Sequence, residues 1–324
     1  MRYGWASSGS VSVNRVAFEH WPVVAFSYVN ETPLDVIKDD VGHIADLMTL
    51  CADEDATTTR LSVAHPDLRV RMLSGAEGPV QELEVLAPQV GYRHAVDRKQ
   101  RHPHQMLLTY EELGGVDVMA RWVDVCPKFG RALASMVSVR RSRMMFAENR
   151  FLNVAAASEA FHRDMYGGEM MPAAEFEKLA NRCLSVTPEA RRSWLLQKLA
   201  YANEPTFRRR LADMYARAGS MASGLCGNRS RWVDTVTSVR NHLTHLDSTK
   251  LNLGGGDLYF LSESLYSVVR ACMLIEVGVA SELIAQKFEA YEFSWYRDRL
   301  AEAIANIRAR LRESSAHDAG KQLQ

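Results

Sequence analysis

The segment from Arg231 to Asp247 carries an apolar stripe that predicts a helix packed against a core. The apolar residues recur at steps of four, three and four positions, which is the spacing of one helix face. They are Trp232, Val236, Val239 and Leu243. A helix with this pattern cannot bury its stripe alone, so the rest of the chain must supply a core for it.

Three polar residues with useful chemistry lie at the end of this stripe: Arg240, Asn241 and His245. A guanidinium is permanently charged and grips anionic oxygens, and an imidazole can move a proton near neutral pH. This combination suits chemistry on a phosphate. A second interpretation stays open, in which the basic residues only complement the dipole at the C-terminus of a helix.

The run Arg240-Asn241-His242-Leu243-Thr244-His245 resembles the R-x4-6-H signature of HEPN domains, including the polar residue that often follows the arginine. A long predicted helix containing Glu159 precedes the run, and an apolar helix from Leu258 to Val279 follows it. This order, behind an N-terminal mixed domain, is similar to the ApeA-type branch of HEPN proteins.

The resemblance implies a metal-independent endoribonuclease in prokaryotic defence by abortive infection, acting as a homodimer with RNA as its substrate. His245 would act as general base on the ribose 2′-hydroxyl or as acid on the leaving oxygen. Arg240 would hold the scissile phosphate, Asn241 would orient Arg240 or donate to a phosphate oxygen, and Glu159 would occupy the family's acidic position. The alternative is a catalytically inactive HEPN module that binds a partner or a nucleotide.

Residues five positions apart on a straight helix project about 140° from each other, so Arg240 and His245 cannot simply point the same way. Three arrangements would bring them to one phosphate. The helix could unwind near Thr244, the long arginine could curl round, or two copies of the chain could each supply one half of a shared site.

Composition limits the other functional classes. The 324 residues suggest about two domains, and a formal net charge of zero argues against a general nucleic-acid coat. The five cysteines form no C-x-x-C pair, which is typical of the reducing cytoplasm and argues against a zinc site. We therefore expect a cytoplasmic protein with no metal, no cofactor and no membrane span, since charged residues interrupt the apolar run Leu258–Ile284.

The first part of the chain predicts a small α+β domain over residues 1–116. Thr32 is expected to cap a helix that runs to about Cys51, and Met1–Ser12 carries little pattern. Four strands are expected: Trp21–Asn30, Thr59–Ala64, Leu68–Met72 and Glu82–Leu86. Residues Gly91 to His104 are expected to form a loop. In proteins that the chain resembles, a longer β-rich domain normally stands here, so we expect a shortened or truncated one.

The remainder predicts an all-α HEPN bundle over residues 117–290 and an amphipathic helix with a tail over residues 291–324, so the chain should be mainly helical. Flexible connections are expected at Gly219–Gly227 and Ser248–Gly256, on either side of the Arg240–His245 segment. Glu159 lies on the face of a helix, predicted from about Ser142 to Tyr166, that also carries Leu152, Ala155 and Ala156. A buried carboxylate is costly unless it is paired, so Glu159 either lies at the solvated edge of this stripe or pairs with Arg240.

Overall fold

The computed structural model describes residues 1–324 apart from 13–14, 88–89, 91–101, 143, 246–252 and 322–324. The chain divides into two compact units, Met1–Asp124 and Val125–Gln324. The first contains the strands and the second is helical, so the predicted fold class, an α+β unit followed by an all-α bundle, is confirmed. The domain boundaries expected at 116/117 and 290/291 stay a prediction.

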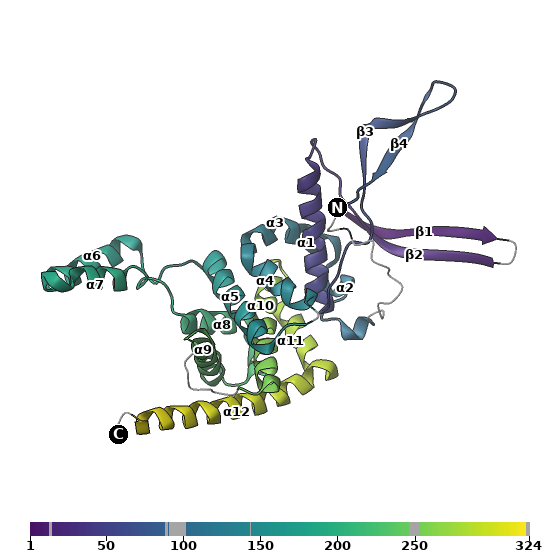
Figure 1. Cartoon of the computed structure of the whole chain (residues 1–324). Coiled ribbons are helices and arrows are strands. Elements are labelled where there is room, and N and C mark those ends of the chain that lie inside the picture. The colour runs from purple at the N-terminus through teal and green to yellow at the C-terminus, as the bar shows by residue number, and fades with distance from the viewer. Residues whose placement is uncertain (13–14, 88–89, 91–101, 143, 246–252, 322–324) are drawn as a thin grey trace. The chain divides into compact units, whose positions relative to one another are not determined.

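The described residues of the first unit form two separate antiparallel hairpins and four helical segments (Figure 1). β1 (Arg2–Ser12) pairs with β2 (Arg15–Ala25), and β3 (Ser62–Arg71) pairs with β4 (Glu77–Glu84). The helical segments are α1 (Leu34–Ala52), η2 (Pro103–Gln105), α2 (Tyr110–Leu113) and α3 (Gly115–Val125), which ends at the boundary of the unit.

The core of the first unit forms around the C-terminal half of α1. Leu47 and Leu50 on α1 are fully buried, as is Trp122 on α3. The indole Nε1 of Trp122 donates to the carbonyl of His43 at 2.7 Å, and the amide of Leu107 donates to the carbonyl of Cys51 at 2.8 Å. These bonds satisfy polar groups that burial would otherwise leave unpaired.

Several local expectations for the first unit are wrong. Thr32 does not cap α1, because its hydroxyl donates to the carbonyl of Asn30 and Pro33 occupies the N-cap position. Met1–Ser12, where the weak pattern indicated no element, contains β1, which pairs with β2. The strands expected separately at Thr59–Ala64 and Leu68–Met72 are joined in β3, where a register irregularity between Ala64 and Arg69 accommodates the proline. Of the expected loop Gly91–His104, residues 91–101 lie outside the described residues.

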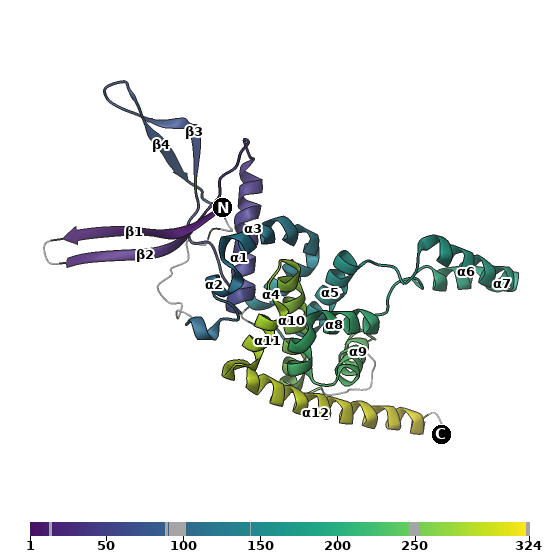
Figure 2. The ribbon, with the colours of Figure 1, turned by 180° about the vertical axis from the view of Figure 1, so that it is seen from behind.

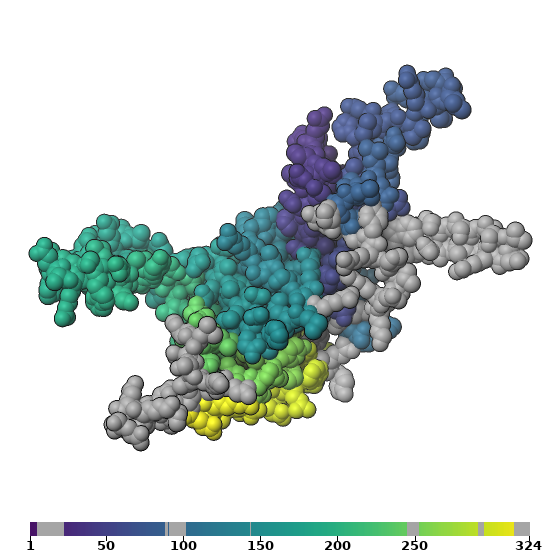
Figure 3. Space-filling model, viewed as in Figure 1, coloured from purple at the N-terminus to yellow at the C-terminus, as the bar shows by residue number. Residues whose placement is uncertain are grey.

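The second unit is a helical bundle centred on α10 (Gly255–Glu276), which packs on the three helices α5 (Ala147–Tyr166), α8 (Phe207–Cys226) and α12 (Tyr291–Lys321) (Figures 1 and 2). Every α10 residue from Leu261 to Leu274 is buried, so the helix is covered on all sides. Figure 3 shows the teal surface of α5 and its neighbour α4 (Gly130–Arg141) on one face of the bundle. The remaining elements are η3 (Cys126–Phe129), α6 (Ala173–Ser185), α7 (Glu189–Leu199), α9 (Arg229–His245) and α11 (Ser281–Glu289).

The length and composition of α10 would allow it to cross a membrane, contrary to the expectation that charged residues exclude this. However, 83% of its most apolar window is buried inside the protein. Burial on this scale is what the central helix of a bundle shows, and the helix also carries the buried charges Glu263 and Arg270. The structure therefore presents α10 as the core of the second unit.

The buried carboxylate of Glu263 on α10 is paired with two arginines. Glu263 accepts two bonds from Arg140 on α4, at 3.0 and 2.6 Å, and a third at 3.0 Å from Arg150 on α5. The Cζ of Arg140 also lies 3.8 Å from the centre of the Tyr266 ring. This network joins three helices, and it positions α5 against the central helix.

The expected flexible connection at Gly219–Gly227 is wrong, since α8 continues through it to Cys226. Gly219 has a φ of 60°, which a glycine adopts at little cost, and it kinks the helix without ending it. Met221, Ala222 and Leu225 are buried after the kink. Tertiary burial thus overrides the weak helix preference of the serines and glycines. The second expected connection, Ser248–Gly256, lies mostly outside the described residues, and α10 begins at Gly255.

Candidate functional site

The position of α9 is fixed by the apolar stripe that the sequence predicted. Trp232, Val236 and Val239 are buried, while Leu243 is half-buried. The indole Nε1 of Trp232 donates to the hydroxyl of Ser264 on α10 at 2.9 Å. This buried bond sets the rotation of α9 about its axis, and the rotation decides where the polar residues at the end of the helix point.

Glu159 lies on α5, at the edge of the face that packs into the bundle. Ala155 and Ser158 on that face are buried, whereas Ala156 is exposed. The side chain of Glu159 is 25% exposed, so it is neither solvated nor fully enclosed. The sequence left open whether Glu159 lies at the solvated edge of the stripe or pairs with Arg240. In the structure the carboxylate lies at the edge of the stripe and is also within reach of a neighbouring helix.

Glu159 and Arg240 form an ion pair between α5 and α9. Glu159 Oε1 lies 2.8 Å from Arg240 Nη2, and the Arg240 side chain is 33% exposed. The expected pairing of these two residues is therefore present in the structure. Arg240 Nη1 also donates to Asn241 Oδ1 at 3.4 Å, a long and correspondingly weak bond.

One further contact shapes the surroundings of Arg240. Its Cζ lies 5.5 Å from the centre of the Phe207 ring on α8, within the range of a cation–π interaction. The carboxylate on one side and the ring on another restrict the guanidinium to few orientations. Because a guanidinium carries five N–H donors, the described contacts leave donors for an anionic ligand that reaches the exposed part of the group.

The backbone of α9 continues to His245, so the helix does not unwind near Thr244. The hydroxyl of Thr244 donates to the carbonyl of Arg240 at 2.9 Å, four positions earlier, as threonine does inside a helix. Arg240 and His245 therefore leave the helix in directions about 140° apart. The side chain of His245 lies outside the described residues, as do residues 246–252. The remaining arrangements from the sequence analysis are a curled arginine and a site shared by two copies.

A second polar network, which was not predicted from the sequence, lies one helical turn beyond Glu159 on α5. His162 is 3% exposed, and its two ring nitrogens lie 3.2 Å from Arg210 Nη1 and 3.2 Å from Asp213 Oδ2, both on α8. Arg210, itself 2% exposed, also donates through Nε to the carbonyl of Pro205 at 3.1 Å. The one available signal was the spacing of His162, three positions after Glu159.

The hydrogen bonds of His162 define its protonation. A guanidinium can only donate, so Nδ1 of His162 must accept from Arg210. The proton of the neutral ring therefore sits on Nε2 and points at Asp213. Burial lowers the pKa of His162 from its ordinary value of 6.5, and the hydrogen bond to Asp213 opposes this shift only in part. The imidazole is thus held neutral and orders α8 against α5 next to the Glu159–Arg240 pair.

The described residues contain no group of three or more histidine, cysteine, aspartate or glutamate side chains that could hold a metal ion. All five cysteines are free thiols, and burial raises the pKa of Cys226 well above its ordinary value. A thiol in the surroundings of Cys226 is a poor nucleophile and a poor metal ligand. The chemistry available at this site therefore comes from Arg240, Asn241, Glu159 and the end of α9.

The fold and this ion pair define the second unit as a helical bundle with a conformationally restricted arginine at its surface. Residues 152–283 match the Apea-like HEPN family, and this range contains Glu159, Arg240, Asn241 and His245. The chain therefore contains an Apea-like HEPN domain, as its motif predicted. HEPN domains are associated with nuclease or defence roles. No curated protein and no solved structure matches the chain.

Proposed function

We propose that the protein is a metal-independent RNA endonuclease that cleaves RNA through the ribose 2′-hydroxyl. The observation that supports this most is the Glu159–Arg240 pair, because it holds a partly exposed guanidinium in one place on a HEPN domain. A purely structural ion pair could lie anywhere on the surface. This one lies on the helix that also carries Asn241 and His245.

Arg240 binds the scissile phosphate in this proposal. Glu159 accepts a hydrogen bond from Nη2, and the N–H donors of Arg240 that this bond leaves would bind the phosphate oxygens. Charge develops on the non-bridging oxygens as the phosphate becomes five-coordinate, and a donor placed in advance stabilises that charge. Asn241 contributes an amide next to Arg240, either to orient it or to bind a phosphate oxygen.

His245 supplies the proton transfers. The 2′-oxygen attacks phosphorus as His245 removes its proton, the bond from phosphorus to the 5′-oxygen breaks, and the 5′-oxygen receives a proton from an imidazolium. The products are a 2′,3′-cyclic phosphate end and a 5′-hydroxyl end. The nucleophile belongs to the substrate, so the reaction requires no metal-bound water.

A homodimer solves the geometric problem of α9. Because Arg240 and His245 diverge on a helix that continues to His245, the imidazole facing one phosphate would come from a second copy of the chain. A two-fold axis between the two helix ends would also place two imidazoles near one phosphate. One of them would act as the base and the other as the acid.

The chemistry is tested with matched oligonucleotides that differ at one 2′ position. RNA should be cut with a 2′,3′-cyclic phosphate on the 5′ fragment, and a single 2′-O-methyl group at the cleaved position should stop cleavage there. EDTA should leave the rate unchanged. Cleavage of the 2′-O-methyl position, or loss of activity in EDTA, would refute this mechanism. RNA binding without any cleavage would instead favour an inactive HEPN module.

We place this activity in the cytoplasm, where free thiols persist and cellular RNA is present. Cleavage of host RNA would halt growth, which suits defence by abortive infection. Induction of the wild-type chain in a bacterium should then arrest growth, and induction of the Arg240→Ala variant should not. Equal growth with both variants would contradict the defence role. The cleavage chemistry would still be decided by the oligonucleotide assay above.

A further inference from the structure

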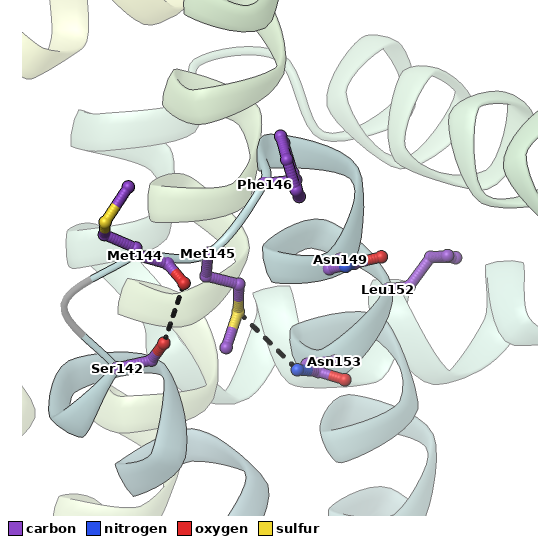
Figure 4. Close-up of a pocket in the computed structure, with 7 residues that line it drawn as sticks. All are labelled: Ser142, Met144, Met145, Phe146, Asn149, Leu152 and Asn153. Atoms are coloured by element: carbon purple, nitrogen blue, oxygen red, sulfur yellow. Dashed lines mark hydrogen bonds between the residues drawn. The ribbon is translucent and has the colours of Figure 1, made fainter.

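A pocket of about 460 Å³ lies where the chain leaves α4 and enters α5 (Figure 4). Ser142 and Met144–Phe146 form one side, and Asn149, Leu152 and Asn153 on the first turns of α5 form the other. Its volume falls within the range of about 300–1,000 Å³ that small-ligand sites occupy. The pocket belongs entirely to the helical unit, and neither the ion pair nor the His162 network uses it.

The described lining of the pocket is neutral and combines an aromatic ring, two thioethers and two carboxamides. Phe146 is 80% exposed and Met144 is 93% exposed, so both apolar side chains are accessible to a ligand. Among the described residues, no charged side chain lines the pocket, so these residues offer no counter-ion to a phosphate or a carboxylate. A flat, neutral ligand with polar edges fits this lining better.

The two asparagines are positioned to bind such polar edges. Asn149 and Asn153 are four positions apart on α5, so they project from neighbouring turns of the same face. Asn153 Nδ2 donates to the sulfur of Met145 at 3.6 Å, which orients the amide and leaves its oxygen available (Figure 4). Asn149 makes no hydrogen bond within the described part of the chain. Carboxamides present a donor and an acceptor side by side, as the edge of a nucleobase does.

α5 connects this pocket to the candidate site. Leu152 in the pocket lies seven positions before Glu159, two helical turns along the same side of α5. The separation is therefore roughly 10 Å, which a short run of nucleotides can span. A strand whose phosphate is held by Arg240 would pass along this side of α5.

We propose that the pocket binds one base of the RNA strand near the scissile phosphate, with Phe146 stacking on the base and Asn149 and Asn153 contacting its edge. This inference rests on the proposed function, because RNA is the substrate in both. The pocket would then determine which base is accepted at one position beside the cleaved bond. Arg240 and His245 would act on the backbone whatever its sequence.

The test measures binding separately from cleavage. Fluorescently labelled 2′-O-methyl oligonucleotides lack the nucleophile, so the wild-type protein can bind them without cutting. Fluorescence anisotropy is recorded for a series in which one abasic site moves along the strand. One position should lose affinity by about tenfold when its base is removed, because stacking on an aromatic ring contributes about this much.

Phe146→Ala should weaken binding of the intact oligonucleotide by a similar factor, and it should abolish the effect of the abasic site at that one position. Phe146→Tyr should restore both. Trp194→Ala removes another exposed aromatic side chain, on α7, and serves as the matched control that should stay within about twofold of wild type. Since Phe146 is exposed, none of these changes should unfold the protein.

Additive effects of Phe146→Ala and the abasic site would overturn the proposal, as would an unchanged affinity in Phe146→Ala. Dissociation of a dimer by Phe146→Ala, seen by sedimentation, would also overturn it, since a second copy would then cover the pocket. The cleavage assay separates this proposal from the proposed function. If Phe146→Ala abolishes the effect of the abasic site in a protein that never cuts RNA, the base-binding pocket is supported and the proposed nuclease function is refuted. If the protein cuts RNA and Phe146→Ala has no effect on binding, the pocket is refuted and the nuclease function stands.

Discussion

Glu159 on α5 and Arg240 on α9 meet at 2.8 Å although 81 positions separate them in the chain. Each side chain is held by the helix that carries it, and the two helices are held by the buried faces of the bundle. The pair therefore depends on the correct packing of α5, α8 and α9. It also gives the proposed phosphate-binding arginine a defined orientation before any substrate arrives.

Replacement of Glu159 should affect stability and cleavage together. Glu159→Ala should lower the free energy of unfolding by about 1 kcal/mol, between the values for exposed and for buried ion pairs. It should also slow RNA cleavage, because Arg240 loses its orienting partner. A double-mutant cycle measures the coupling between the two residues. It compares urea unfolding and cleavage rates of wild type, Glu159→Ala, Arg240→Ala and the double variant. Simple additivity in both quantities would show that the pair is not energetically coupled.

The network around His162 predicts a pH dependence of stability. The pKa of His162 is lowered in the folded protein, so below pH 6.5 the unfolded chain binds a proton that the folded chain rejects. Stability should therefore fall as the pH falls below about 6.5, with a limiting slope of about 1.4 kcal/mol per pH unit for one such group. Arg210 and Arg209 oppose protonation of the ring, and Asp213 favours it.

The measurement compares urea unfolding of wild type and His162→Gln at pH 7.5 and pH 5.5. Glutamine retains an acceptor for Arg210 and cannot titrate. The loss of stability between the two pH values should be smaller in His162→Gln than in wild type. Equal losses would assign the acid sensitivity to other groups.

The buried glutamate of α10 should matter more for stability than any surface pair. Glu263 is 6% exposed and neutralises Arg140 and Arg150, so Glu263→Ala leaves two inward-facing cations without their carboxylate. We expect a loss of about 3–5 kcal/mol in the free energy of unfolding, the cost typical of breaking a buried pair. Glu302→Ala, which removes the exposed partner of Arg299, is the control and should change stability by under about 1 kcal/mol. Similar effects of both variants would contradict the burial argument.

A shared site requires a dimer in solution. Sedimentation at micromolar concentration should give about twice the chain mass of 36.4 kDa. Mixing Arg240→Ala with His245→Ala chains should then restore part of the cleavage activity, because one of the mixed sites regains both residues. A fully active monomer, or the absence of any restored activity in a dimer, would rule out the shared site.

The helices of the second unit could be predicted from the period of their apolar residues, whereas the tertiary contacts could not be predicted from local sequence. The stripe from Trp232 to Val239 follows the helix period, and the apolar residues of α10 occupy more than one face, so the burial of both could be predicted. The continuation of α8 through Gly219 and the existence of β1 depend on neighbours that the local sequence does not reveal. The Glu159–Arg240 pair was expected from the family resemblance together with the cost of a buried carboxylate. The contacts of His162 with Arg210 and Asp213 lie 48 and 51 positions away and leave no local pattern.

The central claim is that Arg240 and His245 cleave RNA, and the most direct measurement is the cleavage rate of one labelled RNA by four purified proteins. Wild type should cut it, and Arg240→Ala and His245→Ala should each be slower by at least about a hundredfold. Arg240→Ala removes a donor that stabilises developing charge, and His245→Ala removes a proton-transfer group. Arg231→Ala removes the same charge from an exposed position nine residues earlier, on the opposite side of α9, and should cut at the wild-type rate. Equal rates for all four proteins would contradict the claim and would attribute the cleavage to a contaminating nuclease.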